Sequence, residues 1–158
     1  MFENVVGNPD AVAALGKLGG ALAITLAAVG SALGTGAAGM AAVGAWKKCY
    51  AQNKAAPFLL VAFVGAPLTQ IIYGMILQGR IVSSAAAQGG VMFHNLLFGG
   101  LFAGLAMGLS AWMQGKAGAA ASDALAETGK GFVLYLLALG MIETVALLTM
   151  IFVQGAVL

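Results

Sequence analysis

The sequence of 158 residues has few charged side chains and almost no cysteine or histidine. Only 8% of its residues are Asp, Glu, Lys or Arg, whereas about 25% is usual for a soluble domain, and its mean hydropathy is +1.00. The single cysteine, Cys49, excludes an internal disulfide and a metal site built from several cysteines. The net charge of +2 and the lack of a basic patch argue against a nucleic-acid partner. The composition indicates a membrane protein with almost no part outside the membrane.

The few charges divide the chain into four long uncharged stretches. About 20 apolar residues suffice for a helix to span a bilayer, so each stretch predicts one spanning helix. Lys47, Lys48 and Lys54 mark the first loop, Arg80 opens the second, and Asp123, Glu127 and Lys130 mark the third. The fold class is therefore an all-α membrane protein whose four transmembrane helices form two helical hairpins. The expected hairpins are residues 1–80, with spans at about 14–46 and 57–79, and residues 81–158, with spans at about 91–122 and 130–155.

The distribution of Lys and Arg predicts the orientation in the membrane, because short cytoplasmic loops are enriched in these residues. Loops 47–56 and 116–130 together hold five lysines, whereas only Lys17 and Arg80 lie on the other side. These two loops are therefore expected in the cytoplasm, and both termini outside. The start of the chain, residues 1–4, lacks a basic region, so no cleaved signal peptide is expected.

Glu143 is the only charged side chain between Gly131 and the C-terminus. A charge at the centre of a membrane helix costs at least ~2.5–3.5 kcal/mol on insertion scales. An intramembrane acid at such a cost indicates an ion or proton site. The alternative is a permanently protonated, structural glutamate.

The four expected helices differ in the size of their side chains. The first is rich in small residues, and the third carries Gly100, Gly104 and Gly108 at a strict spacing of four. Small residues on one face allow helices to approach closely in lipid. We therefore expect the first and third helices to form a crowded inner layer and the bulkier second and fourth helices to lie outside it.

Several polar residues accompany Glu143 within the apolar stretches. Pro67 frees a backbone carbonyl and kinks the second helix, and Thr69, Gln70 and Tyr73 can share a face of that helix. Gln114 lies in the third helix and Thr144 follows Glu143. This set of oxygen ligands suits a hard cation, which favours Na⁺ over H⁺. The alternative is that Gln70 and Gln114 only join helices by hydrogen bonds, worth ~0.6–2 kcal/mol each.

A weak internal repeat relates the two halves of the chain. The segment from Ser31 to Gly36 resembles the segment from Ser110 to Gly115, and each precedes a helix with one central polar residue. That residue is Gln70 in the first half and Glu143 in the second, so only the second hairpin carries the acid.

A duplicated hairpin of this size with an acid only in the fourth helix resembles the membrane-rotor proteolipid, the c or K subunit, of V-type rotary ATPases. The most specific motifs are Pro67–Tyr73, Gln114–Gly115–Lys116 and Met141–Thr144, and they look most like the bacterial Na⁺-transporting branch. The resemblance covers essentially the whole chain. It implies a homo-oligomeric ring in lipid, a stator subunit that supplies an arginine, and central-stalk subunits, with no organic cofactor. The sequence itself contains no phosphate-binding motif, so a nucleotide site is expected in another subunit, and no nucleic-acid partner is expected.

The resemblance also assigns roles to individual residues. Glu143 would bind and release the ion, and Gln70, Thr69, Gln114 and the carbonyl of Ala66 would supply further oxygens for Na⁺. Tyr73 would donate a hydrogen bond to the Glu143 carboxylate. The same rotor carrying H⁺ remains an alternative, as does a small proton-coupled secondary transporter.

Overall fold

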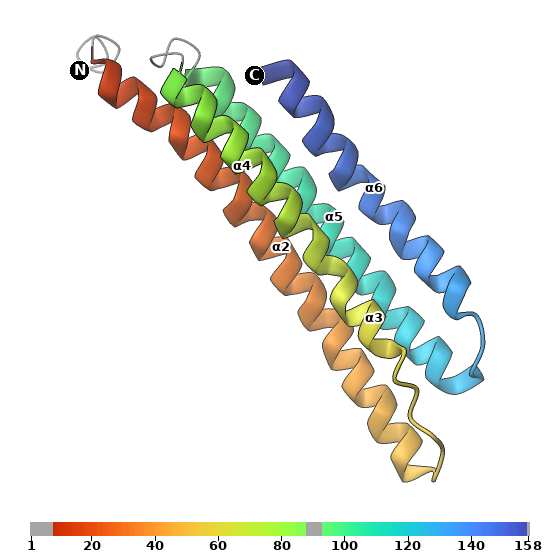
Figure 1. The fold of residues 1–158 in the computed structure, drawn as a ribbon. Coiled ribbons are helices and arrows are strands. Elements are labelled where there is room, and N and C mark those ends of the chain that lie inside the picture. The colour runs from red at the N-terminus through yellow and green to blue at the C-terminus, as the bar shows by residue number, and fades with distance from the viewer. Residues whose placement is uncertain (1–7, 88–92, 158) are drawn as a thin grey trace.

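The computed structural model describes residues 8–87 and 93–157, which form a bundle of long helices (Figure 1). Helix α2 spans Pro9–Ala51, α5 spans Phe93–Thr128 and α6 spans Phe132–Val157. The remaining span is divided into α3 (Leu60–Gly65), the 3₁₀ turn η1 (Ala66–Leu68) and α4 (Thr69–Ala87). Within the described ranges, four helical segments are long and apolar enough to cross a membrane. The predicted all-α membrane fold is confirmed.

Capping side chains and glycines mark the points where the intrahelical backbone hydrogen bonds of the helices begin or end. The side chain of Asn8 accepts hydrogen bonds from the backbone N–H groups of Asp10 and Ala11, with Pro9 in the first turn, and so caps α2. The turn between α5 and α6 contains Gly129 and Gly131 at φ +66° and +90°, a region that glycine enters without a steric penalty. Short connections of this kind make consecutive helices antiparallel.

Three of the helices continue past the charges that were expected to mark loops. Arg80 does not open a loop but lies inside α4, which continues to Ala87, and Lys48 lies in the last turns of α2. Glu127 belongs to α5 rather than to a loop. The charges mark the edge of the apolar stretch, whereas Ala, Ser and Lys allow a helix to continue into a polar environment. At 1.5 Å per residue, α2 is roughly 65 Å long, about twice the hydrocarbon thickness.

The division into hairpins at residues 1–80 and 81–158 stays a prediction, as does the orientation of the termini. The N-terminal residues 1–4 and the expected start of the third span at 91 lie outside the described residues. The beginning of α2 and the end of α6 lie at the same end of the bundle (Figure 1), as an even number of spans requires.

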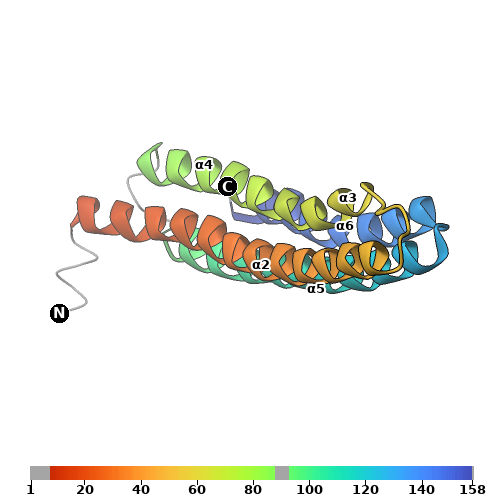
Figure 2. The same ribbon diagram turned by 90° about the horizontal axis from the view of Figure 1, so that it is seen from below.

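Helices α2 and α5 run side by side and form the centre of the fold (Figure 2). A Cβ atom added to Gly30 would lie 2.0 Å from the backbone oxygen of Gly108, and one added to Gly100 would lie 1.9 Å from the oxygen of Gly19. These distances leave no room for a side chain, so glycine sets the separation of the two helices. The predicted close packing of the first and third helices is confirmed.

Helices α4 and α6 lie over the pair formed by α2 and α5, with α4 against α2 and α6 against α5 (Figures 1 and 2).

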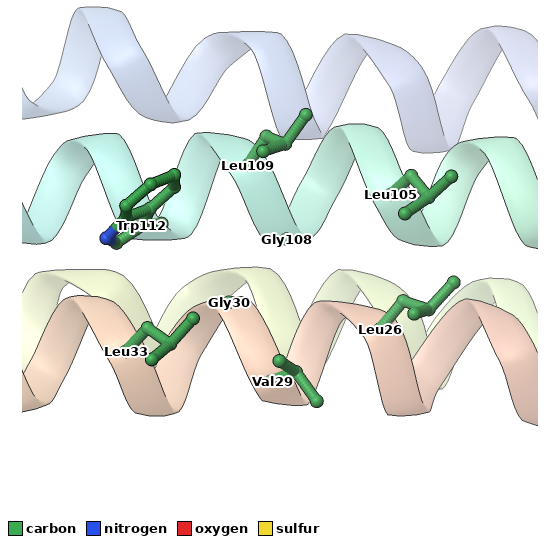
Figure 3. A pocket seen from close by; sticks show the side chains of 8 residues that line it. All are labelled: Leu26, Val29, Gly30, Leu33, Leu105, Gly108, Leu109 and Trp112. Atoms are coloured by element: carbon green, nitrogen blue, oxygen red, sulfur yellow. The ribbon is translucent and has the colours of Figure 1, made fainter.

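On the α2–α5 pair, Gly30 and Gly108 lie at a shallow apolar hollow (Figure 3). Its lining contains none of the predicted site residues. The other lining side chains are Leu26, Val29, Leu33, Leu105, Leu109 and Trp112.

Candidate ion-binding site

Glu143 lies half-buried in the middle of α6, where side chains of two other helices reach its carboxylate. The hydroxyl of Tyr73, from α4, donates a hydrogen bond of 2.7 Å to Oε1. The amide Nε2 of Gln114, from α5, donates to Oε2 at 3.2 Å. Each carboxylate oxygen therefore accepts a hydrogen bond from a different helix, which fixes the carboxyl group between α4, α5 and α6.

Gln114 of α5 connects the Glu143 carboxylate to Gln70 of α4. Its Nε2 also donates to the backbone oxygen of Leu139 at 3.0 Å, one turn before Glu143. Its Oε1 accepts a hydrogen bond of 2.8 Å from Nε2 of Gln70. Both glutamine side chains are fully buried. Because a buried amide left without partners costs ~1–3 kcal/mol, these bonds hold the two side chains in place.

The helix break at Pro67 supplies a further group of oxygens. Pro67 has no backbone N–H, and the chain passes from α3 through the 3₁₀ turn η1 into α4 at this point. The hydroxyl of Thr69 lies 3.1 Å from the carbonyl oxygen of Ala66 and 3.2 Å from Oε1 of Gln70. A hydroxyl, a backbone carbonyl and an amide oxygen therefore converge immediately after the break.

The structure brings the six predicted site residues into one hydrogen-bonded cluster. The chain of contacts runs from Tyr73 through Glu143, Gln114 and Gln70 to Thr69 and Ala66. Their role as ion ligands stays a prediction. The cluster contains one carboxylate, several neutral oxygens and no cationic side chain, so it can hold one positive charge, either a hard cation or a proton.

Thr144 does not join the cluster, although the sequence grouped it with Glu143. Its side chain is exposed, and its hydroxyl donates at 2.7 Å to the backbone oxygen of Met141 in its own helix. Successive residues of a helix point about 100° apart. A threonine directly after an inward-facing glutamate is therefore turned away from the site.

Ser110 is a residue of the site that sequence reasoning did not assign. Its hydroxyl donates at 2.8 Å to the backbone oxygen of Ile142, the residue before Glu143. It lies one turn before Gln114 on the same face of α5. The two side chains bind consecutive parts of α6 and hold the Glu143 turn against α5. The spacing of four between Ser110 and Gln114 was the available signal.

Comparison with known families supports a specific class of membrane protein. Residues 97–153 match the model of a family that comprises the C subunits of ATP synthase. The match covers about a third of the chain, comprising most of α5 and α6, and it includes Gln114 and Glu143. No curated protein matches the chain. The part of the chain that forms most of α5 and α6 is therefore similar to an ion-carrying proteolipid subunit of ATP synthase.

Proposed function

We propose that this chain is the rotor-ring subunit of a V-type rotary ATPase and that it carries Na⁺ on Glu143. The observation that supports this function is the cluster that joins the only acid of α6 to Tyr73 of α4 and Gln114 of α5. The family match over α5 and α6 supports a rotor proteolipid over a small secondary transporter. Copies of the chain would form a homo-oligomeric ring in the lipid of the membrane.

The oxygens around Glu143 favour Na⁺ as the carried ion. A proton needs one basic oxygen, which Glu143 supplies alone. The convergence of Thr69 Oγ1 with the Ala66 carbonyl and Gln70 Oε1, at 3.1 and 3.2 Å, provides neutral oxygens that a proton does not require. Oxygen ligands of this type suit hard cations. Glu143 would neutralise the charge of the ion, and Gln114 Oε1 would complete the set.

The position of Glu143 suits transport by rotation. With the ion bound, the site is neutral and can pass along the lipid boundary, whereas an empty, ionised carboxylate there is costly. An arginine of a stator subunit would pair with the empty carboxylate and so displace the ion. Tyr73 would hold the loaded carboxylate closed between exchanges. Central-stalk subunits would couple rotation to ATP hydrolysis elsewhere, since the proposed role of this chain is ion carriage.

The same rotor carrying H⁺ is the second candidate, and one observation favours it. Gln70 and Gln114 satisfy each other through a direct amide hydrogen bond of 2.8 Å. The two glutamines can therefore be paired without a cation between them.

Carbodiimide labelling of the purified ring tests the proposal. These reagents attack a protonated carboxyl in an apolar site, so we expect them to label Glu143, and the labelling is measured over about pH 5–8 with and without Na⁺. Na⁺ should suppress this labelling, and Glu143→Gln should abolish both labelling and transport while the ring still assembles. Glu127→Gln is the matched control, because Glu127 is exposed and paired with Lys48.

The outcomes distinguish Na⁺ from H⁺ as the carried ion and also test whether Glu143 is the carrier. Labelling that falls as the pH rises but ignores Na⁺ would make this a proton-carrying ring. A Glu143→Gln ring that still transports ions would show that Glu143 is not the carrier.

A further inference from the structure

Ser31 of α2 carries a buried hydroxyl without a hydrogen-bond partner among the described residues. Its side chain is only 2% exposed. The hydroxyl of Thr35, one turn later, also lacks a partner there, but its residue is less deeply buried. Several other helical Ser and Thr side chains of this protein donate to a backbone oxygen three or four residues earlier. Examples are Thr25 to Ala21, Ser122 to Gly118, Thr128 to Ala124 and Thr149 to Val145. Ser31 therefore has unused hydrogen-bonding capacity inside the bundle.

The register of α2 and α4 places Ser31 at the level of Gln70. A Cβ atom on Gly74 would lie 2.9 Å from the Cβ of Ala27, and a Cβ on Gly34 would lie 2.9 Å from the Cβ of Pro67. Ser31 lies between Ala27 and Gly34 on the same face of α2. Gln70 lies between Gly74 and Pro67 on the facing helix. The unpartnered hydroxyl and the buried amide are thus opposite each other.

A cation in the proposed site would compete with the amide of Gln70. The Nε2 group of Gln70 donates to Gln114 Oε1 at 2.8 Å, and a Na⁺ ion bound to that oxygen repels the N–H. The oxygens of both glutamines can face the cation only if this N–H turns away. The displaced group is buried, so it needs another acceptor.

We propose that Ser31 Oγ accepts the hydrogen bond from Gln70 Nε2 when the ion is bound. The Ser31 hydroxyl proton can then donate to the carbonyl of Ala27, in the same way that Thr25 donates to Ala21. Ser110, the other serine near the site, already donates to Ile142. Ser31 is then a positioning residue, which acts through Gln70 and favours Na⁺ over H⁺. This inference rests on the proposed function.

The test measures Na⁺ protection of Glu143 in the intact ring carrying Ser31→Ala. A hydrogen bond between neutral groups corresponds to roughly a two- to tenfold change in an equilibrium constant. The Na⁺ concentration that halves carbodiimide labelling should therefore rise by about that factor. The pH dependence of labelling without Na⁺ should stay unchanged, because a proton on Glu143 does not require Gln70 to turn. The ring should be no less stable, since the substitution removes a buried group without a partner.

Two further variants isolate the role of Ser31. Thr25→Val removes a hydroxyl of the same helix, but this hydroxyl already donates to the backbone oxygen of Ala21. The substitution should therefore leave Na⁺ protection unchanged. In a Gln70→Leu ring, adding Ser31→Ala should weaken protection no further, because the two residues act as one unit.

The results distinguish the two proposals. A wild-type ring that Na⁺ protects, together with a Ser31→Ala ring of equal Na⁺ affinity, would overturn the role of Ser31 and leave the proposed function intact. Additive effects of Ser31→Ala and Gln70→Leu would also overturn it. A wild-type ring that Na⁺ does not protect would overturn both the Na⁺ assignment and the role of Ser31.

Discussion

Replacing Gly30 by alanine should separate the two central helices. The added Cβ atom would lie 2.0 Å from the backbone oxygen of Gly108 and 2.3 Å from its Cα, whereas ordinary contact begins at 3.4 Å. The obstacle is backbone, which cannot rotate aside as a side chain can. Helices α2 and α5 must therefore move apart by more than an ångström along the line of contact.

The expected loss of stability in Gly30→Ala is the difference between a gain in backbone entropy and a cost of overpacking. Alanine in place of a helical glycine gains about 0.5–1 kcal/mol from backbone entropy. Overpacking of a tight interface costs typically ~1–3 kcal/mol, and the contact here is among the shortest in the bundle. We expect a net destabilisation of about 1–2 kcal/mol. Separation of the helices would also displace Gln114, so the Na⁺ affinity should fall with the stability.

Gly36→Ala is the matched control in the same helix. A Cβ atom at Gly36 would have no heavy atom within 4 Å in its own chain, and the same holds for Gly44. These two substitutions should cause no overpacking and should therefore raise the free energy of unfolding by about 0.5–1 kcal/mol, the backbone-entropy gain of alanine over glycine. The assay is the temperature at which the purified ring dissociates in detergent. A Gly30→Ala ring that dissociates at the same temperature as the Gly36→Ala ring, or higher, would refute the close-packing argument.

Individual contacts give three further predictions. Tyr73→Phe removes the 2.7 Å hydrogen bond to Glu143, and since a bond to a charged group contributes ~1.5–3 kcal/mol, Na⁺ protection from labelling should weaken about tenfold or more. Phe63→Ala should destabilise the protein by about 3–5 kcal/mol in thermal unfolding, because the ring of Phe63 is fully buried and packs on two other aromatic rings. Lys48→Ala should leave the temperature of thermal unfolding almost unchanged, because Lys48 and its partner Glu127 are both about half exposed and water screens their attraction.

The apolar pattern predicted the helices but not where they end. Uncharged stretches identify the part of a helix that lies in hydrocarbon. The helix itself continues wherever the following residues tolerate it, as through Arg80 to Ala87 in α4. The glycine spacing of α5 predicted its partner correctly, because only close backbone approach explains such regular small residues.

Composition and spacing predicted the residues of the site but not their contacts. The family resemblance added one contact, the hydrogen bond from Tyr73 to Glu143, which the structure contains. The rarity of polar groups in apolar stretches identified Glu143, Gln70 and Gln114, and helical spacing added Tyr73. Spacing along one helix cannot show which side chain of another helix will meet it. The bond from Ser110 to Ile142 and the unpartnered hydroxyl of Ser31 depend on the register between helices, which only the assembled bundle defines.

The central polar residues of α4 and α6 belong to a single hydrogen-bonded cluster. Gln70 of the first half donates to Gln114, and Gln114 donates to Glu143 of the second half. A second carboxylate in place of Gln70 would stand beside the first with only one amide between them, and like charges at such a distance disfavour each other. It would also lack the N–H that now satisfies Gln114 Oε1. A neutral amide at Gln70 therefore leaves Glu143 as the single carboxylate of the cluster, so the cluster can compensate one positive charge rather than two.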